Sequence, residues 1–231
     1  MKKSRSQLLK DLVASDPDIE SILSRLSIIL SDLPDTDKTI QINEWINNEL
    51  SGYPDIHSLP AYRIIKGRPM GMYVVNGVHQ YKNALVPIRF SQMPTDEIDE
   101  LELIKLPNSI KEIQNMIKQN NSIGIPIPTE LLHVYSTYEL QMLQVTMQLS
   151  SSQLVTIETT VKSKLRKIVL ELDKEFTNID ELDISEEISA DSQKTKEVTQ
   201  AIYTTITDNS INIGDKNKIK KSNLGFFKRK D

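Results

Sequence analysis

Apolar residues recur at helical spacing over the first part of the chain. Between Leu8 and Leu33 they fall three or four positions apart, which places them on one face of a helix. Asp16 followed by Pro17 interrupts this pattern, because an acidic cap and a proline at the first helical position typically start a helix. The pattern predicts a helical hairpin whose second helix is capped by Asp16.

A third, short helix is predicted in QINEWINNELSGYPD, where Gly52 is placed to end it before Pro54. Its apolar stripe consists of Ile42, Trp45, Ile46 and Leu50.

Between Leu59 and Phe90 the pattern changes to short runs rich in β-branched and aromatic residues, separated by turn formers. Asn76 and Gly77 suit a two-residue hairpin turn, because both tolerate positive φ. These runs predict a small antiparallel sheet. Within them, Gly67 to Gly71 lacks the lysine and serine of a phosphate-binding loop, and we interpret it as a turn.

The next stretch mixes short elements. The acidic residues from Asp96 to Glu102 suggest a solvated loop, and Ser109 with Glu112 forms a capping box that opens a helix through about Gln119. IPIP is predicted to be extended, with Thr129 capping a short helix. ELQMLQVTMQL alternates as a strand does, with a slip in register near Leu143.

A long amphipathic helix is predicted from about Gln153 to Phe176, with Lys162, Lys164, Arg166 and Lys167 off its apolar face. Residues 177–199 are acidic, contain few residues able to pack, and suggest a linker. Residues 200–231 suggest a β-rich tail. The predicted fold is therefore α+β, with one domain over 1–176 followed by the linker and the tail.

Composition excludes several classes of function. The 231 residues carry a formal net charge of −4, which gives no overall attraction to nucleic acid or anionic membranes. The absence of cysteine removes disulfides and thiolate chemistry. The N-terminus does not match a signal peptide, and no apolar run approaches the roughly 18 to 20 residues of a membrane span. We expect a cytoplasmic protein.

The stretch NEWINNELSGYPD, followed closely by LPAYR, resembles the signature of the AbiTii family. The resemblance continues through PNSIKEI, IPIP and VKSKLRKIVLELDKEF, and covers about Leu8 to Phe176. It implies a bacterial protein of abortive infection, a phage defence that halts or sacrifices the infected cell. The resemblance carries no catalytic residues with it.

Candidate catalytic patterns are weak. His57, His79 and His133 do not follow an arginine at the spacing used by helical ribonucleases, and Pro54-Asp55 lacks the later Glu-x-Lys of a metal nuclease. Asp55 and His57 lie two residues apart, but a turn in which Asp55 bonds local backbone is favoured. We expect no metal, no cofactor and no catalytic residue, although whether the chain is an enzyme stays open.

Two groups of residues are candidates for binding. Aromatic and arginine side chains dominate binding hot spots, so Trp45, Tyr53, Tyr62 and Arg63 form a candidate recognition surface. The structural alternative is that Trp45 and Tyr53 fix the third helix against the sheet.

The tail places one apolar residue every five or six positions between turn residues, as in short stacked rungs. A rung or two cannot bury its own apolar face, so stacking of several chains is expected, against the alternative of a disordered tail. The candidate assembly residues are Ile206, Ile211, Ile213, Ile219 and Leu224. Any contact with nucleic acid or membrane is expected only through the basic Lys216–Lys230 segment.

The sequence thus predicts an anti-phage protein that acts by binding an unidentified host or phage protein and by forming a homo-oligomer. The alternative is a toxic effector enzyme, such as a nuclease, with a site that spacing does not reveal.

Overall fold

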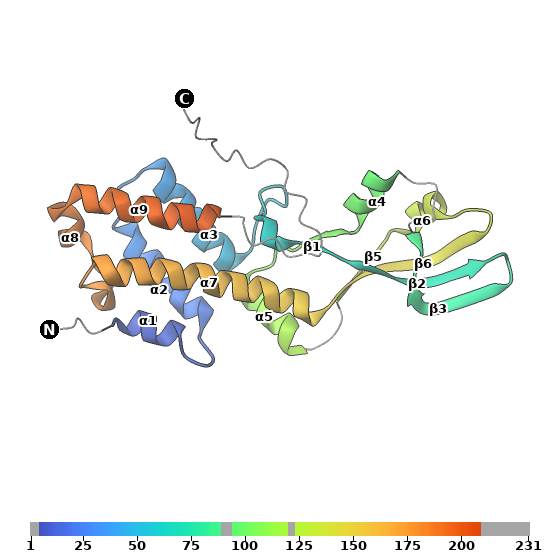
Figure 1. Cartoon of the computed structure of the whole chain (residues 1–231), viewed down its shortest axis with the longest axis horizontal. Coiled ribbons are helices and arrows are strands. Elements are labelled where there is room, and N and C mark those ends of the chain that lie inside the picture. The colour runs from blue at the N-terminus through green and yellow to red at the C-terminus, as the bar shows by residue number, and fades with distance from the viewer. Residues whose placement is uncertain (1–4, 89–93, 120–122, 209–231) are drawn as a thin grey trace, which may run out of the picture.

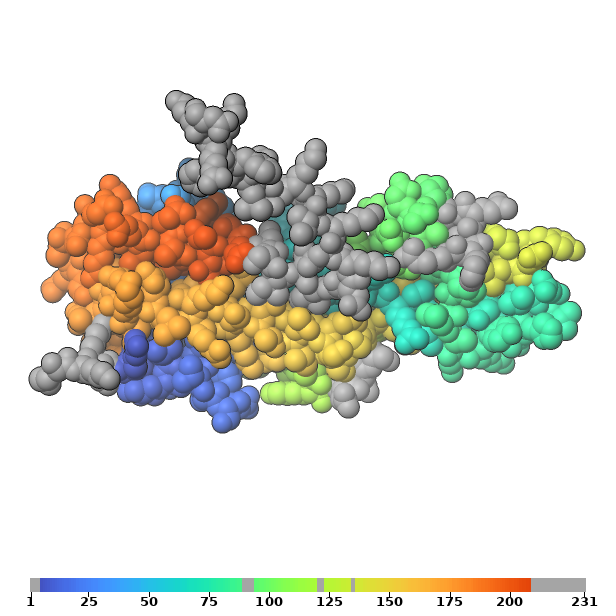
Figure 2. Space-filling model, viewed as in Figure 1, coloured from blue at the N-terminus to red at the C-terminus, as the bar shows by residue number. Residues whose placement is uncertain are grey.

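Most helices lie toward one end of an elongated molecule and the strands toward the other (Figure 1), and the space-filling view in Figure 2 shows the same long outline. The computed structural model describes residues 5–88, 94–119 and 123–208. Helices gather at one end, and a twisted antiparallel sheet extends from the other. The long helix α7 (Ser151–Glu175) continues directly from the last strand into the bundle. The predicted α+β class is confirmed.

The bundle is built on α7, which buries one apolar face along its length. The other bundle helices are α1 (Gln7–Leu12), α2 (Ile19–Ser31), α3 (Asp37–Ser51), α5 (Ile110–Gln119), α8 (Ser185–Ala190) and α9 (Ser192–Thr207).

The helical hairpin is confirmed, but its cap is not the predicted one. Asp18 rather than Asp16 caps α2, its carboxylate accepting a hydrogen bond from the Ser21 amide at 3.1 Å. The helix therefore begins two residues later than the proline suggested.

The main sheet has the strand order β3-β2-β6-β5, with every neighbouring pair antiparallel. A separate two-stranded ribbon pairs β1 with β4. Two short helices, α4 (Thr95–Leu101) and α6 (Thr129–Tyr135), accompany the strands (Figure 1). The strands are β1 (Ile64–Lys66), β2 (Arg68–Val75), β3 (His79–Leu85), β4 (Leu103–Lys105), β5 (Ile123–Pro126) and β6 (Leu140–Leu149).

Two local predictions in the sheet are confirmed. Asn76 and Gly77 have φ of 52° and 69°, the left-handed conformation of a tight hairpin turn. Met72 pairs with Gln144 and Tyr73 with Met142, so Leu143 is an extra residue in β6. This bulge is the predicted slip in register, and it keeps Met142 and Val145 both buried.

Three local predictions are wrong. Gly71 lies inside β2 rather than in a turn, because a Cβ there would stand 1.8 Å from the Gln144 carbonyl oxygen and only glycine permits the strands to approach. The acidic stretch after Pro94 forms α4, which buries Ile98. Thr129 does not cap α6, since Pro128 holds the cap position.

The predicted linker is also wrong over 177–199, as is the β-rich start of the tail at 200–207. Both fold as part of the bundle, ending in α9, which packs against α3 and α7. The acidic residues act as acceptors: Glu187 bonds the Thr177 and Asn178 amides, and Asp191 caps α9 through the Lys194 amide. The buried aliphatic residues of this segment are Ile179, Ile184, Ile188, Val198, Ile202 and Ile206.

We predict that a chain ending at Phe176 fails to fold, whereas one ending at Asp208 folds. Each buried aliphatic side chain stabilises by about 1.5 to 3 kcal/mol, so losing those of residues 177–208 removes roughly 10 kcal/mol, comparable with a whole domain. Circular dichroism with urea unfolding measures this. A cooperative transition in the shorter chain would contradict it.

The N-terminal segment is fastened to the far end of α7. Asp173 is 2% exposed, accepts a hydrogen bond from the Ser6 amide at 2.7 Å and forms an ion pair with Arg5 at 2.7 Å. Burial alone would raise the pKa of Asp173, but these hydrogen bonds outweigh it and lower the pKa below the usual 3.8.

We predict that Asp173 makes the fold sensitive to acid. Because the folded-state pKa lies below the unfolded one, the stabilisation is complete above the unfolded value and is lost as pH falls through the folded one. The difference in unfolding free energy between the native chain and Asp173→Asn should therefore be largest near neutral pH and shrink below about pH 4. Urea unfolding at several pH values tests this, with Asp16→Asn as the exposed control.

Candidate functional site

The family-like signature forms the end of α3 and the turn that follows it. Gly52 ends α3 with φ of 93°, as predicted, and a Cβ there would lie 2.9 Å from the Pro107 carbonyl oxygen. The Tyr53 amide donates to that same oxygen at 2.7 Å. This turn sends Tyr53 back toward the bundle, where the other signature side chains meet it.

Glu49 is the centre of a buried polar network. Its carboxylate is fully buried and accepts hydrogen bonds from the hydroxyls of Tyr53 at 2.6 Å and Tyr62 at 2.5 Å. Its second oxygen forms a short ion pair with Arg63. Trp45 donates its indole N–H to the Tyr62 hydroxyl at 2.9 Å. Both carboxylate oxygens are therefore engaged.

Arg63 is fully buried as well and is held by more than its ion pair. It donates to the Asn108 carbonyl oxygen at 2.7 Å, and its guanidinium lies 5.4 Å from the centre of the Tyr53 ring. These contacts join α3, the loop before α5 and the short 3-10 turn Ala61–Arg63 that leads into β1. The network ties the bundle to the start of the sheet region.

The two tyrosines and the arginine of this network have raised pKa values. Burial, followed by repulsion from Glu49, raises the pKa of Tyr53 far above its usual value and also raises that of Tyr62. Burial works to lower the pKa of Arg63, but Glu49 outweighs it and raises that pKa. The two phenols thus stay neutral and the guanidinium stays charged, so these groups do not act as proton-transfer catalysts near neutral pH.

Lys164 extends the network to α9. It was expected off the apolar face of α7, yet it is 3% exposed and donates to the carbonyl oxygens of Thr205, Ile206 and Asp208. A cation at the C-terminal end of a helix satisfies carbonyl groups that lack partners within the helix. Burial lowers the pKa of Lys164.

A shallow polar groove lies against the signature turn, with Tyr53 of this network among its lining residues, and has a volume of about 590 Å³. Asn47, Asn48 and Ser51 line it from α3, and Asn108 and Glu112 line it from the start of α5. Side-chain amides both donate and accept hydrogen bonds, so this groove suits a polar partner.

The four residues of the predicted recognition surface therefore lie together, but they are buried. Trp45, Tyr53, Tyr62 and Arg63 meet in one cluster, with exposures of 7%, 6%, 2% and 0%, so they do not form an exposed surface. Glu49 and Lys164 were missed as members. Glu49 lies one helical turn before Tyr53, which is a weak signal, whereas Lys164 carries none.

The predicted assembly residues lie partly inside and partly outside the described part of the chain. Ile206 belongs to α9 and is 6% exposed, so it is part of the core. Ile211, Ile213, Ile219, Leu224 and the basic Lys216–Lys230 segment lie outside the described residues.

Three further expectations concern Asp55 with His57, a metal site and a membrane span. The His57 amide donates to the Asp55 carboxylate at 2.8 Å, which is the predicted turn. Within the described ranges, no three histidine or acidic side chains gather as a metal site would require. In the same residues, no helix has the length and apolarity needed to cross a membrane.

The architecture defines the chain as an α+β protein whose helical bundle is organised around a buried Glu–Arg pair. It belongs to the AbiTii family, whose model matches residues 5–201. This match passes Phe176, where the resemblance was expected to end, and takes in α8 and most of α9. The family name suggests an abortive-infection protein of phage defence. Neither a curated protein nor a solved structure shows significant similarity to the chain.

We predict that Glu49→Gln destabilises the fold by about 3 to 5 kcal/mol, because it leaves the Arg63 charge buried without its partner. Glu44→Gln, at an exposed position of the same helix, should change stability by no more than about 0.5 kcal/mol. Urea unfolding of both variants measures the difference. Equal, small effects would show that the ion pair is not what holds this region.

Proposed function

We propose that this protein serves anti-phage defence by abortive infection and that it acts through binding and homo-oligomeric assembly. The supporting observation is that the central side chains of the family-like signature are buried. Its buried side chains form a network in which Glu49 is paired with Arg63. A signature whose central side chains are buried in this way supports a scaffold that presents surfaces to a partner.

The binding surface in this proposal is the groove beside the signature turn. Its amide and hydroxyl groups, with Glu112 as the acidic residue, suit the exposed backbone and polar side chains of a host or phage protein. This groove takes the place of the buried aromatic residues as the recognition surface. Asn47 and Ser51 are exposed and offer direct contact.

The assembly element in this proposal is residues 209–231. Ile211, Ile213, Ile219 and Leu224 are spaced for stacked short rungs, which need neighbouring copies to bury their apolar faces. The segment begins one residue after Asp208, whose carbonyl oxygen Lys164 holds against the bundle. Each chain would thus present its tail from a fixed point.

We expect the full chain to be oligomeric and a chain ending at Asp208 to be monomeric, because the shorter chain keeps the whole core and loses only the rungs. Light scattering gives the two masses. A variant carrying Ile213→Asn and Ile219→Asn should resemble the shorter chain, while Ser210→Asn and Ser222→Asn should not. Equal masses for the full and shortened chains would contradict tail-driven assembly.

The same chains separate assembly from catalysis in cells. In a bacterial host challenged with phage, loss of protection on removing residues 209–231 supports assembly as the working step. Loss of protection in a single polar variant that still folds and assembles would favour a toxic enzyme instead. An Asn47→Arg and Ser51→Arg variant that remains folded and oligomeric but no longer protects would support binding at the groove.

A further inference from the structure

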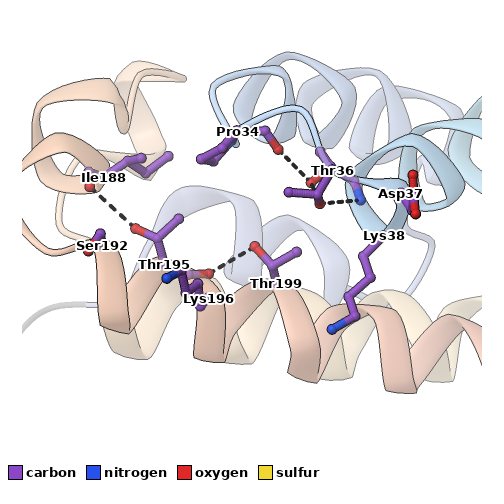
Figure 3. Close-up of a pocket in the computed structure, with 10 residues that line it drawn as sticks. Pro34, Thr36, Asp37, Lys38, Ile188, Ser192, Thr195, Lys196 and Thr199 are labelled. Atoms are coloured by element: carbon purple, nitrogen blue, oxygen red, sulfur yellow. Dashed lines mark hydrogen bonds between the residues drawn. The ribbon is translucent and has the colours of Figure 1, made fainter.

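A second cavity lies on the other side of the bundle, where α9 passes the start of α3. It has a volume of about 360 Å³ and is bounded by the Pro34–Thr39 turn on one side and by α8 and the first turns of α9 on the other (Figure 3). It is separate from both the buried signature network and the polar groove.

The walls of this cavity are apolar although threonines dominate them. The Thr39 hydroxyl donates to the Pro34 carbonyl, the Thr195 hydroxyl to that of Asp191, and the Thr199 hydroxyl to that of Thr195, each at 2.8 Å. With the hydroxyls occupied, these side chains contribute their methyl groups, together with Pro34 and Ile188. Figure 3 shows Thr195 and Thr199 directed from α9 toward the Pro34–Thr36 turn.

The rim is polar and mainly basic. Lys38 and Lys196 both line the cavity from exposed positions, and Asp37 is the acidic residue among the lining side chains. Within the described part of the chain, neither lysine takes part in an ion pair. The Lys38 side chain reaches from α3 toward α9 (Figure 3). Both helices also begin at the cavity, where Thr36 caps α3 and Asp191 caps α9.

We propose that this cavity binds a small amphipathic anion, with its apolar part among the threonine methyl groups and its carboxylate or phosphate between Lys38 and Lys196. Among the lining side chains the two lysines outnumber Asp37, although the chain as a whole carries a net charge of −4. Ser192, exposed at the first position of α9, adds a hydroxyl to the rim. This site is independent of the proposed assembly function.

The size of the cavity limits the ligand. A dry cavity of about 150 Å³ holds benzene, so this one accommodates an apolar body roughly twice as large, such as a medium-length acyl chain or a substituted aromatic ring. Ligands of this size with one charged group bind with dissociation constants on the order of 0.1 to 1 mM.

Octanoate is a suitable probe and 1-octanol its uncharged counterpart, each titrated into the full chain by calorimetry and by amide chemical shifts. We expect octanoate to bind about tenfold more tightly than octanol, with the largest shifts in residues 34–39 and 188–199. The double variant Lys38→Gln and Lys196→Gln should weaken octanoate binding about tenfold and leave octanol unchanged. The matched control is Lys10→Gln with Lys105→Gln, two exposed lysines outside the cavity, and it should change binding less than twofold.

Thr199→Leu enlarges a side chain inside the cavity and should abolish binding of both probes. If that variant unfolds, Ser192→Leu at the exposed rim provides the same obstruction. Each of several results would overturn the proposal: no binding of octanoate up to 10 mM, equal affinity for octanol and octanoate, equal loss in the control variant, or shifts confined to other parts of the chain. Phosphate monoesters of similar length, tested in the same way, show which anionic group the rim prefers.

Discussion

A carboxylate and a guanidinium are both withdrawn from water at the centre of this molecule, and the surrounding structure pairs them with each other and with neighbouring polar groups. Taking such ions out of water costs several kcal/mol each, which their attraction offsets only when the geometry is good and the remaining donors and acceptors are bonded. Glu49 meets this condition through Arg63 and two tyrosine hydroxyls. The direction of α3, the turn at Gly52 and the path into β1 all follow from that requirement.

Tyr62 links this ion pair to α9. Its ring lies 5.7 Å from the ammonium group of Lys164, which in turn holds the final carbonyl groups of α9. One chain of contacts therefore runs from α3 through the 3-10 turn and α7 to the end of α9. The groove, which Tyr53 lines, and the end of α9, which Lys164 holds, both contact this arrangement.

The sequence predicted those elements whose signal is local. The stripe of α7, the turn at Asn76 and the bulge at Leu143 depend on neighbouring residues, and each was found. The segment 177–199 was missed because its helices are short and its few aliphatic residues lie among acids. These helices are stable only against α7 and α3, and composition does not reveal a packing partner more than a hundred residues away along the chain.

Four residues of the site were predicted, but their burial and their partner Glu49 were not. Trp45, Tyr53, Tyr62 and Arg63 were singled out because aromatic and arginine side chains favour interfaces, and the same properties suit a buried network. Only the fold shows that Glu49 faces Arg63 and removes these side chains from the surface. The second cavity could not be predicted from the sequence, because the sequence does not show whether a threonine hydroxyl bonds its own helix or is exposed to solvent.

The fastening of the N-terminal segment to Asp173 and Asp180 has a consequence for the order of folding. Helix α1 is completed by residues 167 and 173 positions later along the chain than the amides they bond, and α3 likewise packs against the later helix α9. Contacts of such long sequence separation slow folding, because the loop entropy must be lost before they form. During synthesis the bundle therefore closes only after α9 has left the ribosome, and a truncated product would expose an open apolar face for chaperones and proteases to recognise.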